Sequence, residues 1–135
     1  NDDAGYWDSM RGNTNRTLLA SAARTATTAS ADQTNYNARG ILVVLNVSAV
    51  TATPDLVLAI QAKDSISAAY LALLTASVAV TTTGTYAYLL YPGAGAAAAG
   101  ITQMAAYPLP RTWRVNVTHG DTDSATYSVS ACLIL

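Results

Sequence analysis

Polar and apolar residues alternate over two neighbouring segments near the C-terminal end of the chain. Residues 113–119 place Trp113, Val115 and Val117 at every second position, and residues 125–135 repeat this pattern. The polar run Gly-Asp-Thr-Asp-Ser lies between the two segments. Strict alternation on both sides of such a turn predicts a β-hairpin with one buried face.

Further segments have the alternating or continuous apolar pattern of strands. Residues 41–45 are apolar at every position, which indicates the centre of a sheet. Residues 17–28 also have helical propensity, but their threonines favour a strand. These additional strands are expected at residues 17–28, 41–50, 56–63, 68–74, 77–83 and 85–91. The third and fourth of them are joined by a short turn, so we expect them to form a second hairpin.

The stretches between these segments are typical of loops. Residues 29–40 are rich in Ser, Asp, Gln and Asn, and they predict a loop. Residues 92–107 are low in complexity, and their small side chains cannot fill a core. They predict either a surface loop or one short helix over residues 96–99.

Short strands at regular spacing predict an all-β fold. We expect a single β-sandwich or small barrel of about seven or eight antiparallel strands, which occupies residues 16–135. Trp113 should be the side chain whose truncation costs the most stability. The expected core residues are Leu18, Val43, Leu45, Val47, Leu58, Ile60, Leu71, Leu73, Leu89, Trp113, Val115, Val117, Tyr127, Val129 and Leu133.

The first 15 residues have a different character. They are rich in Asn, Asp and Gly and show no periodicity, so we expect an extended N-terminal arm. Tyr6, Trp7 and Met10 are the apolar side chains that could anchor this arm, either on its own domain or on a neighbouring molecule. We favour a neighbour, which makes these three the expected partner-binding residues.

The charge content is low. The net charge is −1, charged residues make up 11% of the chain, and Glu is absent. Because solubility depends on surface charge, this composition indicates that much of the surface is covered in an assembly. A monomer with a Thr- and Ser-rich surface is the alternative. The six Arg residues are spread along the chain without forming a basic patch, which argues against a nucleic-acid partner.

Candidate chemistry is confined to the turn near the C-terminal end. His119, Asp121, Asp123 and Ser124 include the residue types of a Ser/His/Asp triad, but a triad is defined by geometry rather than by sequence proximity. Asp and Ser at such positions usually accept hydrogen bonds from the backbone of the turn. We therefore expect no enzymatic activity and no catalytic residues.

Cofactor and metal sites are not expected either. Two Asp residues alone do not form a calcium loop, and Gly93-Ala94-Gly95 lacks the Lys of a nucleotide-binding loop. Cys132 is the single cysteine, and we interpret it as a small buried apolar residue. No apolar run reaches the ~18 residues that span a membrane, and no secretory segment is visible after Asn1, so we expect no membrane partner.

Several segments resemble, in order and spacing, small structural proteins encoded by tailed bacteriophages. The resemblance covers most of the chain from Arg16 to Leu135. Its segments are residues 16–25 (RTLLASAART), 38–47 (ARGILVVLNV), 60–64 (IQAKD), 91–93 (YPG), 109–115 (LPRTWRV) and 119–121 (HGD).

This resemblance implies a capsid decoration or cement protein, a β-rich module that binds the outside of an icosahedral head. The implied partners are the major capsid protein and neighbouring copies of the chain, with a homotrimer at threefold positions. The implied location is the capsid surface of the virion, after assembly in the host cytoplasm. Two alternatives stay open: another virion component, such as a tail or head-fibre module, and a carbohydrate-binding β-sandwich that uses exposed Tyr rings.

Overall fold

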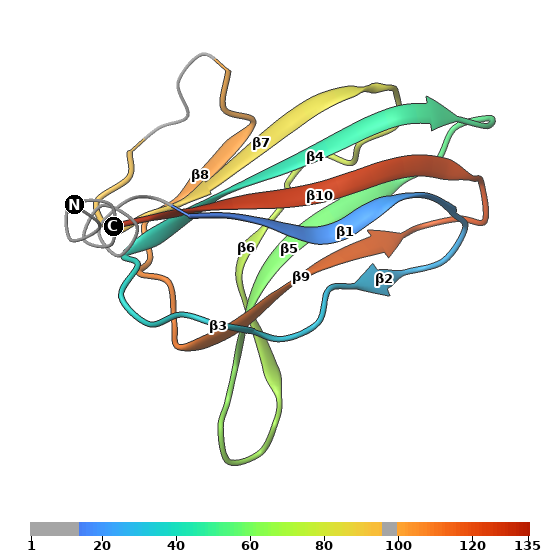
Figure 1. The fold of residues 1–135 in the computed structure, drawn as a ribbon. Coiled ribbons are helices and arrows are strands. Elements are labelled where there is room, and N and C mark those ends of the chain that lie inside the picture. Colours follow the sequence, from blue (N-terminus) through green and yellow to red (C-terminus); the bar gives the residue numbers. More distant parts are fainter. Residues whose placement is uncertain (1–13, 96–99) are drawn as a thin grey trace, which may run out of the picture.

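The structure, a computed structural model, describes residues 14–95 and 100–135. Within these ranges the chain forms ten strands and no helix, and the strands make two sheets (Figure 1). The strands are β1 (Thr14–Arg24), β2 (Thr28–Ala29), β3 (Gln33–Thr34), β4 (Gly40–Val50), β5 (Leu56–Lys63), β6 (Tyr70–Thr75), β7 (Gly84–Leu90), β8 (Gln103–Ala105), β9 (Thr112–His119) and β10 (Ala125–Ile134). The all-β class expected from the sequence is confirmed.

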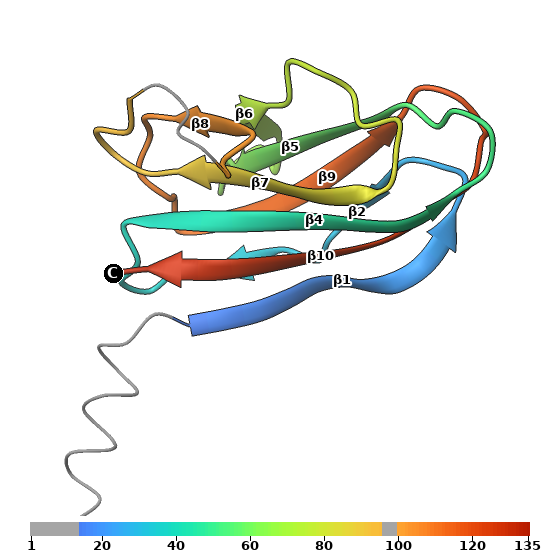
Figure 2. The same ribbon diagram turned by 90° about the horizontal axis from the view of Figure 1, so that it is seen from above.

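The first sheet has the strand order β1-β10-β4-β7-β8. Strand β4 is central, as its continuous apolar run predicted, and Val43 lies opposite Ala131 of β10 and Tyr88 of β7. Figure 2 shows β1, β10, β4 and β7 side by side, with β1 at the outside. Strand β1 begins at Thr14, so it includes two residues that we expected in the arm.

The second sheet has the order β2-β9-β5-β6, and β3 also pairs with β9. Strands β5 and β6 form the expected antiparallel hairpin, with Lys63 opposite Tyr70. Strand β9 lies between β5 and the two short strands, so that Val117 is opposite both Leu58 and Thr28. Figure 1 shows that the turn of the β5–β6 hairpin extends beyond the rest of the two sheets.

The two closing strands do not form the hairpin that their alternation predicted. Strand β9 belongs to the second sheet and β10 to the first, so the turn between them carries the chain from one sheet to the other. Both strands still bury one face, because the inward side chains of each point into the same core. Alternation indicates that one face of a strand is buried. It does not show whether two such strands pair in one sheet or lie in two sheets that face each other.

The inner faces of both sheets supply one hydrophobic core. Its largest fully buried side chains are Trp113, Tyr88, Tyr127, Ile41, Leu45, Leu56, Leu58, Ile60, Leu90, Val43, Val47 and Val115. Two of the expected core residues lie elsewhere. Leu71 is 62% exposed because it lies where the hairpin extends past the core, and Leu89 faces outward between the fully buried Tyr88 and Leu90.

Other sequence predictions were also wrong. Residues 77–83 form no strand, and Val80 makes only an isolated bridge to Leu56. The expected strand at residues 17–28 is replaced by β1 and the separate short strand β2. The expected loops contain the short strands β3 and β8, so the described residues form ten strands in all. Strand β8 pairs in parallel with β7, and the two separate sheets do not close into a barrel. The alternative of a helix at residues 96–99 lies outside the described residues.

The buried hydroxyl of Tyr88 makes stability depend on pH. It has no hydrogen-bond partner in the described part of the chain. Burial, with a smaller contribution from neighbouring Tyr86, raises the pKa of Tyr88 to about 12. An unfolded Tyr ionises near pH 10, so the folded state holds this proton more tightly. The resulting stability is fully present below pH ~10 and is lost as the pH rises toward ~12.

We therefore expect Tyr88→Phe to reduce this alkaline loss of stability. Near neutral pH the change should have little effect on stability, because it removes a buried hydroxyl that has no hydrogen-bond partner among the described residues. Urea unfolding at about pH 8 and about pH 11 measures the difference, since the free energy of unfolding should fall less for the variant than for the wild type. An equal fall in both proteins would contradict the assignment.

Candidate functional site

His119 and the neighbouring Asp residues lie at one end of the domain, which we call the His119 end. The Nε2 atom of His119 lies 2.9 Å from the hydroxyl oxygen of Tyr127, and the two ring centroids are 5.8 Å apart. Burial lowers the pKa of His119, Asp121 opposes this shift, and the positive charge of Arg24 adds to it. Arg24 also lies 4.7 Å from the Tyr127 ring and donates a hydrogen bond to the Tyr127 carbonyl. These contacts tie β1, β9 and β10 together.

The Asp side chains of this turn accept hydrogen bonds from backbone amides. Asp123 accepts one from the Thr53 amide at 3.1 Å, and Asp121 accepts one from the Asp123 amide at 3.1 Å. Through its backbone the turn also contacts the loop before β5, because the Gly120 amide donates to the Asp55 carbonyl. In the described ranges, no three His, Cys or Asp side chains are grouped to hold a metal ion, and the surface has no pocket. The arrangement links two loops.

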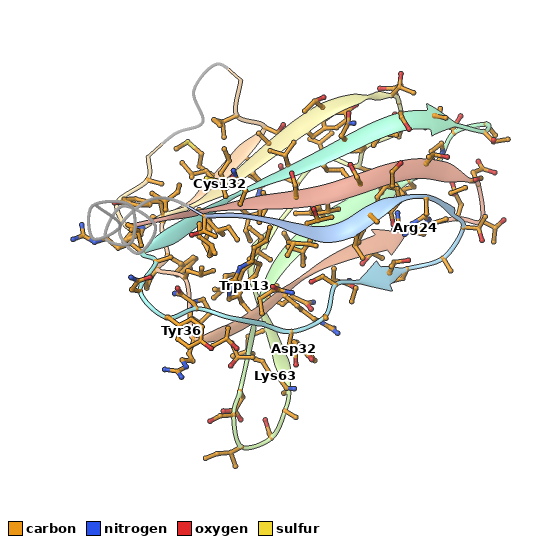
Figure 3. The ribbon with its side chains drawn as sticks, viewed as in Figure 1. Arg24, Asp32, Tyr36, Lys63, Trp113 and Cys132 are labelled. Atoms are coloured by element: carbon orange, nitrogen blue, oxygen red, sulfur yellow. The ribbon has the colours of Figure 1, made fainter. Side chains whose placement is uncertain are left out.

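The opposite end of the domain carries most of the exposed apolar surface. We call it the hairpin end, because the β5–β6 turn lies there with the starts of β4 and β9 and the ends of β7 and β10. Five large apolar side chains are strongly exposed in the described ranges, and four of them belong to this end. They are Tyr36 (77%), Ile66 (94%), Leu71 (62%) and Tyr107 (52%). Figure 3 shows Tyr36 at the end of the molecule opposite Arg24.

The turn of the hairpin holds Ile66 in a defined position. The Asp64 carboxylate accepts hydrogen bonds from the Ser67 amide at 3.0 Å and from the Ser67 hydroxyl at 2.5 Å, and these bonds lower its pKa. The Ala68 amide donates to the Asp64 carbonyl, and Ala68 adopts a left-handed conformation with φ 61°. This network orders a short turn whose apolar residue, Ile66, points away from the domain and is 94% exposed.

The base of the hairpin is fixed to the loop between β2 and β3. Asp32 accepts hydrogen bonds from Lys63 and from the Tyr70 hydroxyl, both at 2.7 Å, and these bonds lower the pKa of the carboxyl group. The guanidinium of Arg114 lies 3.5 Å from the centroid of the Tyr70 ring. Figure 3 shows Asp32 and Lys63 near the root of the hairpin. The hairpin is therefore held at its base by contacts between charged and aromatic side chains.

Charge is divided between the two ends of the domain. In the described residues, the hairpin end holds Arg16, Arg39, Lys63, Arg111 and Arg114 against Asp32 and Asp64, a side-chain balance of plus three. The His119 end holds Arg24 against three Asp residues, a balance of minus two. The exposed apolar side chains thus lie at the end whose described side chains carry a net positive charge. Such an end suits a partner surface that is acidic around an apolar contact.

The residues singled out from the sequence are not those of the hairpin end. Tyr6, Trp7 and Met10 lie outside the described residues. The sequence did contain a signal for Ile66, an apolar residue between two serines directly after Asp64, in a segment that had to turn. Leu71 was assigned to the core because alternation does not show where a hairpin passes the limit of the opposing sheet.

Comparisons with protein-family models and with curated protein sequences find no match to this chain. Within the described residues, no helix is long and apolar enough to cross a membrane. The hairpin end is the candidate site because it carries exposed apolar side chains and a net positive side-chain charge.

Proposed function

We propose that this chain is a non-enzymatic structural protein of a bacteriophage virion, which binds the outer surface of the capsid lattice and stabilises the head. The observation that carries the proposal is the hairpin end, where Tyr36, Ile66, Leu71 and Tyr107 are exposed and the described side chains carry a net positive charge. Aromatic and aliphatic side chains at the centre of a contact, with charges around them, are typical of protein interfaces.

Two further observations support a binding role. The resemblance to phage structural proteins reaches both ends of the domain, through residues 38–47, 60–64 and 109–115 from the hairpin end and residues 119–121 at the His119 end. The low content of charged residues, 11%, suits a protein whose surface is largely covered by neighbours. In this proposal the chain is a single β-sandwich over residues 16–135, with residues 1–15 as an extended arm. Its partners are the major capsid protein and other copies of the chain, arranged as a trimer.

The proposal is tested by adding the full chain to heads that lack it. We expect saturable binding to the heads, and treated heads should withstand a higher temperature before they release DNA, because a ligand of the assembled state stabilises that state. Binding should weaken as salt is added, since the hairpin end is net positive. Failure to bind heads, or binding only to purified tails, would contradict a decoration role and favour a tail or head-fibre component.

Carbohydrate binding is the second candidate function, because the exposed Tyr36 and Tyr107 rings offer surfaces on which a sugar could stack. The Arg111 guanidinium lies 5.5 Å from the centroid of the Tyr36 ring, and this side chain is 77% exposed. A glycan titration separates the two functions. Saturable binding that Tyr36→Ala abolishes would favour the carbohydrate function over the capsid function.

A further inference from the structure

The outer face of the first sheet is divided into a polar half and an apolar half. Toward the His119 end, its outward residues are polar, and the Thr85 hydroxyl donates to the Asn46 side chain at 3.2 Å. Toward the hairpin end, the outward residues of β4, β7, β8 and β10 are apolar and only partly buried. We call this group the apolar patch; it consists of Leu42, Val44, Leu89, Met104, Cys132 and Ile134.

Strand register makes the apolar patch continuous. Leu42 is opposite Cys132 on one side and Leu89 on the other, and Leu89 is opposite Met104. These four side chains form one row across four strands, because register partners lie on the same face about 5 Å apart. Val44 and Ile134 flank this row. Figure 3 shows Cys132 on β10.

The outward face of the second sheet provides a comparison within the same molecule. There, at the hairpin end, the outward positions carry Gln61, Lys63 and Arg114, which bond with one another or with neighbours. A sheet with one solvated face normally carries polar residues at such positions. The apolar patch departs from this rule and has the character of a surface that a partner covers.

Strand β1 brings the start of the chain to the edge of this patch. Thr14 is opposite Leu133, and Asn15 is opposite Cys132. The 13 residues before Thr14 contain Tyr6, Trp7 and Met10, and their side chains include three Asp and one Arg. They therefore combine bulky apolar side chains, which match the apolar patch, with a side-chain balance of minus two. This balance is opposite in sign to that of the hairpin end as a whole, of which Lys63 and Arg114 lie on the other sheet.

We propose that residues 1–13 of one copy bind the apolar patch of a neighbouring copy. At ~3.3–3.6 Å per residue, 13 residues span up to about 45 Å, whereas five strands ~4.8 Å apart are about 19 Å wide. Among the described residues β1 is the edge strand of the first sheet, so a neighbouring copy can approach its start. This contact is between a segment and a different surface, so repeated copies can form a closed ring.

Sedimentation velocity of full-length variants tests this proposal without any capsid, so its failure would leave the proposed head binding untouched. The wild type should associate as its concentration rises. Trp7→Ala and Leu42→Asp should each weaken association by roughly 10-fold or more, as expected for loss of a central contact. Met104→Asp, on the short strand β8, repeats the patch test at a position less critical for folding. Asn46→Asp, on the polar half of the same face, is the matched control and should associate like the wild type.

Mixing the variants gives the sharpest result. Trp7→Ala keeps an intact patch and Leu42→Asp keeps an intact segment, so an equimolar mixture should form pairs that neither variant forms alone. Circular dichroism spectra establish that each variant is folded. The proposal is overturned if the wild type stays monomeric, if Trp7→Ala associates as tightly as the wild type, or if the mixture forms no pairs.

Discussion

Trp113→Ala should cost about 3–5 kcal/mol of folding stability, the largest loss expected from a single core truncation in this domain. Trp113 is fully buried on β9 and is the largest side chain in the core. Its removal leaves a cavity between the two sheets that the surrounding strands cannot fill completely. Because small domains have net stabilities of only about 5–15 kcal/mol, the variant should be partly unfolded at modest urea concentrations.

Trp113→Phe is the matched control for this cavity. Phenylalanine keeps most of the buried ring and removes an indole N–H that has no hydrogen-bond partner in the described part of the chain. Its cost should therefore be clearly smaller than that of alanine. Urea unfolding followed by circular dichroism measures both free energies. A loss below about 1 kcal/mol for Trp113→Ala, or equal losses for the two variants, would show that this site is not the centre of the core.

Replacing Ile66 by Asp should weaken head binding by roughly 10-fold or more without destabilising the domain. Ile66 is 94% exposed at the end of the β5–β6 hairpin, so the folded domain gains little from its side chain. A carboxylate there would place an unpaired charge in the contact and reduce the positive balance of the hairpin end. Leu71→Asp, at a second exposed position of the same hairpin, should act in the same direction.

Val78→Asp is the control for this effect. Val78 is 73% exposed, and it lies close to Val80, which pairs with Leu56 toward the His119 end. It therefore offers the same chemical change on an apolar residue of similar exposure, away from the hairpin end. Binding isotherms of labelled protein on heads measure all three variants. Equal weakening by Val78→Asp and Ile66→Asp would show that exposed apolar area in general, rather than the hairpin end, determines binding.

Local patterns in the sequence predicted most of the long strands well, although β1 spans Thr14–Arg24 and not the expected residues 17–28. The continuous apolar run at residues 41–45 correctly placed β4 in the centre of a sheet, and alternation located β5, β7, β9 and β10 within one or two residues. The short turn after Lys63 correctly indicated the β5–β6 hairpin. These predictions succeed because alternation and turn chemistry depend on neighbours in the sequence.

The pairing of strands distant in the sequence could not be predicted from these local patterns. Strand β9 could equally have paired with β10 or crossed to the other sheet, because both arrangements bury the same alternating side chains. Strands β3 and β8 show no apolar alternation of their own. They form only through pairing with strands distant in the sequence, β9 and β7. Leu71 was wrongly assigned to the core because the sequence does not show where the opposing sheet ends. Leu89 was wrongly assigned because the sequence does not show which face of β7 turns inward.

The candidate site was only partly visible in the sequence. From the sequence, Tyr6, Trp7 and Met10 were the expected partner-binding residues, and the turn at His119 was the one place considered for chemistry. The candidate surfaces in the structure are the hairpin end and the apolar patch. Both surfaces combine residues from strands far apart in the chain: Leu42, Leu89 and Cys132 become neighbours only through the register of β4 with β7 and β10. The proposed contact between residues 1–13 and this face rests on the composition of the segment, known from the sequence, and on the strand register, known from the structure.

In the proposed function, the hairpin end of the domain contacts the outer surface of a capsid. Imaging decorated heads at a resolution that separates the two sheets tests it most directly, because the protruding β5–β6 hairpin marks the orientation of the domain (Figure 1). We expect density on the outside of the shell, with this hairpin against the capsid. Density with the hairpin in solvent and the His119 end against the shell, or no density on the shell, would contradict it.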